Sequence, residues 1–239
     1  MSFKCLSCVV ALSICGEAVA QDEATTEPPF DPTAIVRVEE DWIAYIRNPD
    51  EAVGAPQIVN VISANQSTDG VFGMVEINHQ SKPQFRSGGF QVQTWIGETN
   101  HAIVFSEEVG PLRNNYDKMT YTVGLSLSAD KFQVSISNGR SRTWGKFAQT
   151  PVMATAPRGS LTMADYSPQF SVDNTTVNVG AHRVELIYQQ RVRYYAAEGL
   201  VYTDETPRVI HRYQEVVQYV SLEDYEKNLS EFNIDITSQ

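Results

Sequence analysis

The sequence predicts an all-β protein, an antiparallel β-sandwich followed by a short C-terminal helix. The main observation is a period of two between Ile35 and Val220, where apolar residues alternate with polar ones. Gly, Pro, Asn and Asp clusters separate these segments at the intervals typical of turns. A helical pattern begins only at Ser221. Roughly ten to thirteen short strands with one late helix are typical of a sandwich.

The first twenty residues have the pattern of a cleavable export signal. Lys4 precedes the apolar run 6–15, and Ala18-Val19-Ala20 has the small-x-small spacing of a signal-peptidase site. The run is too short to span a bilayer. We therefore predict cleavage after Ala20 and a secreted, periplasmic or cell-surface protein without a transmembrane segment. The alternative is lipoprotein processing at Cys15, but Ile14 is larger than the residue such processing prefers.

Cysteine and charge content narrow the class further. Cys5, Cys8 and Cys15 all lie within the predicted signal, so the mature chain would have no disulfide and would depend on its core for stability. The formal net charge is −11. Nucleic acids and anionic membranes attract basic surfaces, so this charge argues against both as partners.

Four segments divide the chain. Residues 1–20 are the signal, and 21–34 are an acidic lead-in rich in Pro and Thr that we expect to be flexible. Residues 35–220 form the sandwich, and 221–239 form the C-terminal helix and tail, with a capping-box pattern at Ser221. The predicted strands are 57–64, 71–79, 89–96, 101–105, 119–127, 132–136, 183–195, 199–203 and 207–220.

Two local patterns make specific predictions. Asn138-Gly139 follows an alternating segment and is the dipeptide that best suits a tight hairpin turn. The segment 183–195 is predicted to be a strand with one apolar face, which only Gln190 interrupts. That face comprises Val184, Leu186, Tyr188, Val192 and Tyr194.

One segment resembles a catalytic signature. Residues 76–81 are similar to the Glu-x-Asp-x-x-Glu motif of laminarinase-type glucanases, with Glu76 at the first position. Asn78 and Ser81 occupy the positions of the assisting Asp and the acid/base Glu. An amide cannot tune a neighbouring carboxylate by its own ionisation, and a serine hydroxyl cannot protonate a glycosidic oxygen at neutral pH, so retaining hydrolysis through this motif fails. A hydrolase or lyase with an unrecognised site remains an alternative, and no catalytic residue is assigned.

Metal sites have weak support. The four histidines, His79, His101, His182 and His211, never occur at the i, i+2 or i+4 spacing of a zinc motif. Structural calcium is an open alternative at the oxygen-rich segments 114–117 and 173–174, although Asn and Asp are equally common in turns.

Two polar strand faces are the candidate binding sites. Trp95 lies beside Gln91 and Gln93 on one face of strand 89–96, and an indole among amides suits a sugar ring and its hydroxyls. Arg191, Arg193 and Tyr195 align with Glu185 and Gln189 on one face of strand 183–195 and are followed by Arg208 and Arg212. This face suits an acidic or sulfated polysaccharide. The alternatives are a covered Trp95 and cross-strand ion pairs with Glu185, Glu198 or Glu215.

Three segments carry a family resemblance: Val38-Glu39-Glu40-Asp41-Trp42, residues 138–145 and Arg191-Val192-Arg193-Tyr194-Tyr195. Together they resemble secreted planctomycete proteins of unknown function, over about residues 36–209. The resemblance implies export and a concanavalin A-like jelly-roll sandwich, the fold of many lectins and glucanases, and it assigns no catalytic residue.

These observations favour a non-catalytic secreted or cell-surface sandwich that binds carbohydrate or forms part of the envelope. The expected partner is an extracellular or cell-envelope polysaccharide. A polysaccharide-active enzyme and a purely architectural protein are the alternatives. The oligomeric state and the ligand are left open by the sequence.

Overall fold

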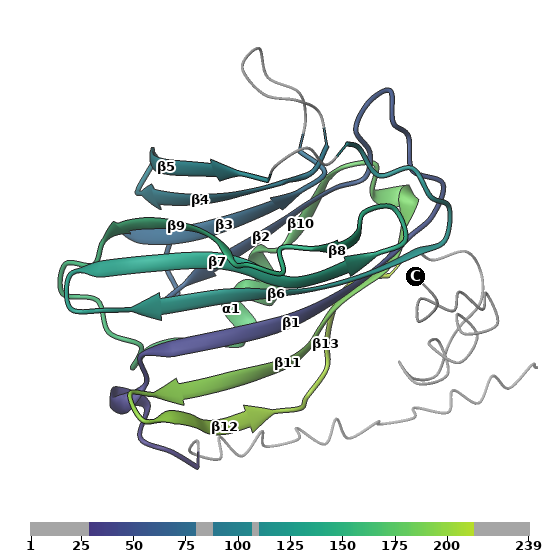
Figure 1. The fold of residues 1–239 in the computed structure, drawn as a ribbon. Helices are drawn as coiled ribbons and strands as arrows, with labels where there is room; N and C mark the ends of the chain where they lie inside the picture. Colours follow the sequence, from purple (N-terminus) through teal and green to yellow (C-terminus); the bar gives the residue numbers. More distant parts are fainter. Residues whose placement is uncertain (1–28, 80–87, 107–109, 213–239) are drawn as a thin grey trace, which may run out of the picture.

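The computed structural model describes residues 29–79, 88–106 and 110–212, which form two stacked antiparallel sheets (Figure 1). One sheet contains β1 (Arg37–Ile46), β6 (Asp117–Leu127), β7 (Lys131–Ser141), β8 (Gly145–Phe147), β9 (Val152–Pro157), β11 (Val184–Ala196), β12 (Gly199–Asp204) and β13 (Arg208–Arg212). The other contains β2 (Gln57–Ser63), β3 (Val71–Ile77), β4 (Phe90–Ile96), β5 (Thr99–Phe105) and β10 (Thr176–Val179).

The strand order confirms the predicted sandwich. The eight-stranded sheet runs β12-β11-β1-β6-β7-β8, with β13 also paired to β11 and β9 to β7. The five-stranded sheet runs β10-β2-β3-β4-β5. The long β1 lies at the middle of the larger sheet, between β11 and β6, although its neighbours come much later in the chain. Residues far apart in sequence therefore meet across β1.

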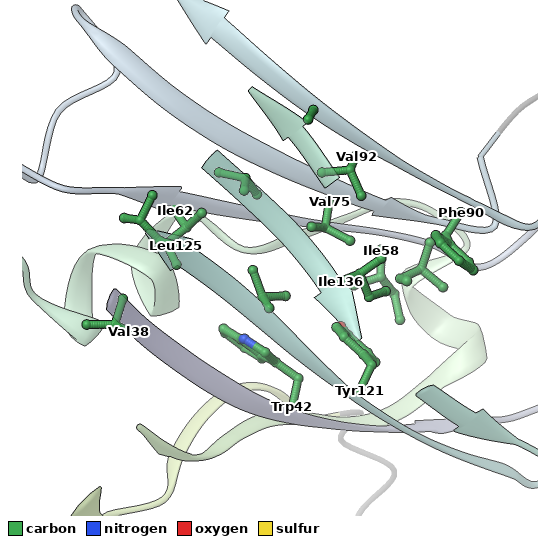
Figure 2. Close-up of a cluster of buried hydrophobic side chains, with 14 of the residues drawn as sticks. Val38, Trp42, Ile58, Ile62, Val75, Phe90, Val92, Tyr121, Leu125 and Ile136 are labelled. Carbon is green, nitrogen blue, oxygen red and sulfur yellow. The ribbon is translucent and has the colours of Figure 1, made fainter. Parts of the chain in front are cut away.

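The core lies between the two sheets, as the period of two predicts (Figure 2). Its side chains include Val38, Trp42, Tyr121, Leu125 and Ile136 from the larger sheet and Ile58, Ile62, Val75, Phe90 and Val92 from the smaller one, all at most 2% exposed. Burial of aliphatic and aromatic side chains on this scale, at about 1.5–3 kcal/mol each, is the main source of stability. The alternation predicted for 119–127 is confirmed in β6.

The predicted apolar face of 183–195 is wrong because β11 contains two bulges. Its register against β1 shifts at Asp41/Trp42 and at Tyr45/Ile46. Each bulge inserts one residue and so moves the following side chains to the other face of the sheet. Leu186 and Tyr188 therefore form a separate outer cluster with Ile43, whereas Ile187 faces the core.

The predicted hairpin at Asn138-Gly139 is also wrong. Both residues lie inside β7, where Asn138 has a φ of 55° and the register against β6 is shifted. The positive φ that favours this dipeptide serves a bulge, and the chain reverses at residues 142–144. Strand β8 then pairs back along β7, with Gly139 opposite Phe147.

The described residues contain a short α-helix that the sequence did not predict. The described α-helix is α1 (Pro168–Asn174), a seven-residue element with Ser167 as its N-cap and Pro168 at its first position. The predicted helix and tail, 221–239, and residues 213–220 of the last predicted strand lie outside the described residues, as does the predicted signal. Nowhere in residues 29–79, 88–106 and 110–212 is a helix long and apolar enough to cross a membrane.

Part of the predicted flexible lead-in is structured. Residues 32–34 form a 3₁₀ turn, capped by the Asp31 side chain through the backbone N–H of Thr33. The centroid of the Phe30 ring lies 4.8 Å from that of Tyr194 and 5.4 Å from that of Tyr202. An aromatic contact with the larger sheet thus fixes the end of a segment whose composition alone favours disorder.

Candidate functional site on the outer face of the five-stranded sheet

The outer face of β3 and β4 gathers the polar residues of the smaller sheet. Glu76 of β3 lies opposite Gln91 of β4, and the next pairs on this face bring Gln93 and Trp95 into the same row. The intervening residues Val75 and Val92 point into the core. Strict alternation along two paired strands therefore places one carboxylate, two amides and an indole side by side.

Three glutamine side chains hold the Glu76 carboxylate. Gln57 Nε2 donates to Oε1, and Gln91 Nε2 donates to Oε2. Gln93 Nε2 donates to Oε2 at 3.3 Å. These amides come from β2 and β4, the two neighbours of β3, so the carboxylate is fixed from both sides. The three amides therefore set the orientation of this carboxylate before any ligand arrives.

Trp95 completes this network through Gln93. Its Nε1–H donates to Gln93 Oε1 at 2.9 Å, and Asn100 Nδ2 of β5 donates to the same oxygen at 3.3 Å. With its oxygen occupied in this way, the Gln93 amide turns its NH₂ group toward Glu76. The Trp95 ring also lies nearly parallel to Phe72, with centroids 6.1 Å apart and an interplanar angle of 11°.

Solvent reaches only part of this site. Gln91 and Gln93 are 3% and 4% exposed, so their amides serve to position the carboxylate. Glu76, Trp95 and Asn100 are partly exposed. The groups that a ligand can touch are therefore the carboxylate, one indole surface and the Asn100 amide, whereas the sequence had pointed to the two glutamines as direct contacts.

The same face does not carry the two carboxylates of a glycosidase. Among the residues of the five paired strands, all of which are described, Glu76 is the one acid. Asn78 is buried, donates from Nδ2 to Pro56 O at 2.8 Å and accepts from Leu112 N at 3.0 Å. It therefore ties two loops together. Ser81 lies outside the described residues.

The second predicted surface is an ion-pair network on the opposite sheet. Arg191 Nε lies 2.6 Å from Asp41 Oδ2, and Arg193 Nη2 lies 2.8 Å from Asp41 Oδ1 and 3.1 Å from Glu39 Oε2. The Tyr195 hydroxyl donates to Glu39 at 2.8 Å. Cross-strand pairing was the alternative reading of this face, and its acids come from β1.

The acids that the sequence suggested as partners of these arginines do not form the network. Glu185 pairs with Arg47, and Glu215 is outside the described residues. Gln189, expected on the same face, lies opposite Trp42 and is fully buried, because of the bulge at Gln190. Arg208, expected on this face, pairs with Asp204, which lies opposite the core residue Val192, and donates to the buried Gln189, so it lies on the inner side of the sheet. Arg191, Arg193 and Arg208 are each paired with a carboxylate, and the face that carries Arg191 and Arg193 is not locally basic.

The loops considered for calcium have other bonding partners. Asp117 accepts from the backbone N–H groups of Arg142 and Thr143, which fixes the β7–β8 turn. Asn115 accepts from the N–H groups of Asn48 and Tyr116. Asp173 accepts from Gln169 at 2.7 Å. The part of the chain that the structure describes contains no group of three or more His, Cys, Asp or Glu residues arranged around a metal position.

No family model matches the chain, and no curated protein matches it. Its place in the planctomycete group therefore stays a prediction. Three solved structures resemble it at low identity. An ancestral congerin is 8% identical with a TM-score of 0.28, and the match covers 52% of this chain and 86% of the congerin. Scytalido-glutamic peptidase with a peptide-based transition state analog is 9% identical with a TM-score of 0.37, and the match covers 80% of this chain and 91% of the peptidase. A tetrameric galectin from the ball sponge Cinachyrella sp. is 13% identical with a TM-score of 0.27, and the match covers 75% of this chain and 91% of the galectin. The sandwich itself is established by the strand pairing.

Proposed function

We propose that the protein is an exported carbohydrate-binding β-sandwich whose ligand lies on the outer face of β3 and β4. The supporting observation is the Glu76 carboxylate, fixed by Gln57, Gln91 and Gln93 beside the partly exposed indole of Trp95. A cell-envelope or extracellular polysaccharide is the expected partner.

The chemistry of the site matches that of a sugar ring. A pyranose presents a C–H surface that packs on an indole and hydroxyls that donate to carboxylates. A carboxylate offers about four acceptor positions, and three are taken by the glutamines, so Glu76 keeps one for a ligand hydroxyl. Because the amides already fix its orientation, binding does not have to order this side chain.

A glycan array with Trp95→Ala and Glu76→Gln variants tests the proposal. The unmodified chain is expected to retain at least one neutral glycan. Each variant is expected to weaken that binding about tenfold, which is the effect of losing about 1.4 kcal/mol. Leu200→Ala is the matched control, because Leu200 is exposed on β12 of the other sheet.

Two results would overturn this proposal. Failure to bind any glycan would favour an architectural role, and binding that is equal in all variants would place the ligand elsewhere. Incubation with soluble polysaccharides separates binding from catalysis. Release of reducing ends that Glu76→Gln abolishes would favour the enzyme alternative.

Export is a second part of the proposal and rests on the N-terminal pattern. The full-length gene product is expected outside the cytoplasm with Gln21 as its first residue. Edman sequencing or intact mass of the exported chain measures this directly. A lipid-modified chain that begins at Cys15 would support the lipoprotein alternative, and an uncleaved cytoplasmic chain would contradict export.

A further inference from the structure

An open pocket of about 610 Å³ lies between the two sheets at one end of the sandwich, and its described lining includes no residue of the Glu76 site. One wall is formed by Phe90 and residues 104–106, and the other by Trp144 and residues 146–153. Residues of β4 and β5 thus face the β8–β9 connection across the pocket. The volume falls within the usual range for small-molecule sites, roughly 300–1,000 Å³.

The pocket exists because the opposite sheet does not cover the inner face of β5 at Val104. Val92 of β4 is fully buried, whereas its paired residue Val104 of β5, on the same inner face, is 36% exposed. Toward the other end of β9 the sheets approach closely, with Ala154 and Ala156 buried between them and Thr94 Oγ1 donating to Thr155 O at 3.1 Å. The opening is therefore confined to the Val104 end.

Aromatic rings form the floor of the pocket. The Phe147 centroid lies 5.5 Å from Phe90 and 5.2 Å from Trp144, the latter pair at an interplanar angle of 87°. Trp144 is held by its Nε1–H, which donates to Gly110 O at 2.8 Å. Phe147 lies over Gly139, where a Cβ atom would come within 2.2 Å of the ring. These rings are fixed without any ligand.

The loop above the rings is also fixed. Gln149 Nε2 donates to the carbonyl oxygens of Gly139 and Phe147, both at 3.2 Å. Asn138 N donates to Ala148 O at 3.1 Å, and Ala148 has a φ of 49°. A pocket whose walls are already ordered loses little conformational entropy on binding.

The described lining of the pocket has a charge opposite to that of the chain. The protein has a formal net charge of −11, yet the described lining contains no carboxylate. Its one charged group is the ammonium of Lys146, which is exposed and forms no ion pair with a described residue. An apolar, aromatic pocket with one unpaired cation at its rim favours a ligand with an apolar body and a single negative charge.

We propose that this pocket binds a small amphipathic anion, such as a medium-chain carboxylate, with its apolar body on Trp144 and Phe147 and its charge at Lys146. Nothing in this assignment depends on carbohydrate binding at Glu76. The Glu76 site lies on the outer face of the smaller sheet, whereas Phe90 and Val104 line the pocket from its inner face, and the two sites differ in chemistry.

Fluorescence titration with anilinonaphthalene sulfonate, an aromatic anion, tests the site in the full chain as its host processes it. Lys146→Gln is expected to weaken binding about fivefold, the effect of losing an ion pair of about 1 kcal/mol. Val104→Trp is expected to abolish binding by filling the pocket, and circular dichroism checks that this variant folds. Lys131→Gln removes an exposed lysine outside the pocket and is the matched control.

Competition identifies the ligand class. Decanoate is expected to displace the dye from the unmodified chain and to lose that ability in Lys146→Gln, whereas decanol is expected to compete weakly in both. Dye binding that is equal in Lys146→Gln, Lys131→Gln and Val104→Trp would overturn the proposal, as would equal competition by decanol. Trp95→Ala and Glu76→Gln are expected to leave dye binding unchanged, so failure of either site is distinguishable from failure of the other.

Discussion

The indole N–H of Trp42 donates a 3.0 Å hydrogen bond to the carboxylate of Glu40, two residues earlier on β1, and both side chains are completely buried. The other carboxylate oxygen accepts from the hydroxyls of Tyr166, at 2.7 Å, and Ser171, at 2.6 Å. All three are neutral donors, and none supplies a positive charge. Burial raises the pKa of Glu40 to about 7, although the hydroxyls of Ser171 and Tyr166 and the indole act to lower it.

The contribution of Glu40 to the free energy of unfolding is therefore expected to fall as the pH rises. The folded state retains the Glu40 proton between the unfolded pKa, near 4.5, and the folded value of about 7. This contribution is complete below pH 4.5 and lost as the pH passes through 7, by a total of about 3 kcal/mol. Glu40→Gln keeps the shape without the charge. Urea unfolding at several pH values should show the variant gaining stability relative to the unmodified chain as the pH increases.

The control for this pH dependence is Glu98→Gln, which removes an exposed carboxylate from the β4–β5 turn. Its free energy of unfolding is expected to run parallel to that of the unmodified chain. A constant difference between Glu40→Gln and the unmodified chain from pH 4.5 to 8 would mean that Glu40 does not titrate in this range.

Tyr166→Phe removes one donor from the Glu40 carboxylate. A hydrogen bond to a charged group contributes about 1.5–3 kcal/mol, so the loss is expected to be of this size at pH 8 and smaller at pH 4.5, where Glu40 is protonated. Thermal unfolding at the two pH values measures it. Tyr202→Phe is the matched control, because Tyr202 belongs to the same aromatic cluster and its hydroxyl has no partner among the described residues. Equal effects of the two variants would contradict a specific role for Tyr166.

Gly139→Ala is expected to destabilise the fold through the Phe147 ring. An added Cβ would lie 2.2 Å from that ring, closer than any van der Waals contact, so the ring or the β7 bulge must move. Overpacking of this kind costs about 1–3 kcal/mol. Gly70→Ala, where the added Cβ meets nothing within 4 Å, should change the free energy of unfolding by less than about 0.5 kcal/mol. Similar denaturation midpoints for the two variants would show that β7 relaxes around the new methyl group.

The alternation of side chains made the sandwich predictable, and its interruptions caused the errors. Strand β6 alternates without a break, and its core face was predicted residue by residue. Strand β11 contains two bulges, which a single strand read alone does not show, because a bulge is defined by the partner strand. Leu186 and Tyr188 were consequently placed on the wrong face. The short helix α1 has only seven residues and too few turns to show a period.

The alternation of side chains within one strand also made part of the candidate site predictable. Gln91, Gln93 and Trp95 share a strand, so their common face follows from the sequence. Gln57 and Asn100 reach the site from neighbouring strands, and Glu76 was recognised through an unrelated motif. Cross-strand register decides these partners, and it depends on tertiary pairing. The acids opposite Arg191 and Arg193 were missed likewise, because β1 is about 150 residues away in the chain.

The acids of β1 are expected to prevent the β11 arginines from binding anionic polysaccharides. Arg191 and Arg193 share Asp41, Arg193 also pairs with Glu39, and Arg37 lies over the Tyr195 ring at 3.8 Å. Replacing both acids in Glu39→Gln/Asp41→Asn keeps hydrogen-bonding side chains but leaves the guanidinium groups unpaired. The unpaired guanidinium groups are expected to attract the sulfate groups of a heparin column. Because salt screens this attraction, the double variant is expected to elute at higher salt than the unmodified chain.

A matched double variant on the other sheet controls for net charge in this experiment. Asp69→Asn/Glu98→Gln removes two exposed carboxylates from turns of the five-stranded sheet, which does not contain β11, and is expected to elute close to the unmodified chain. Retention that rises equally in both double variants would mean that total charge decides binding. Strong retention of the unmodified chain that Arg193→Ala removes would instead show that the arginines bind sulfated glycans despite their ion pairs.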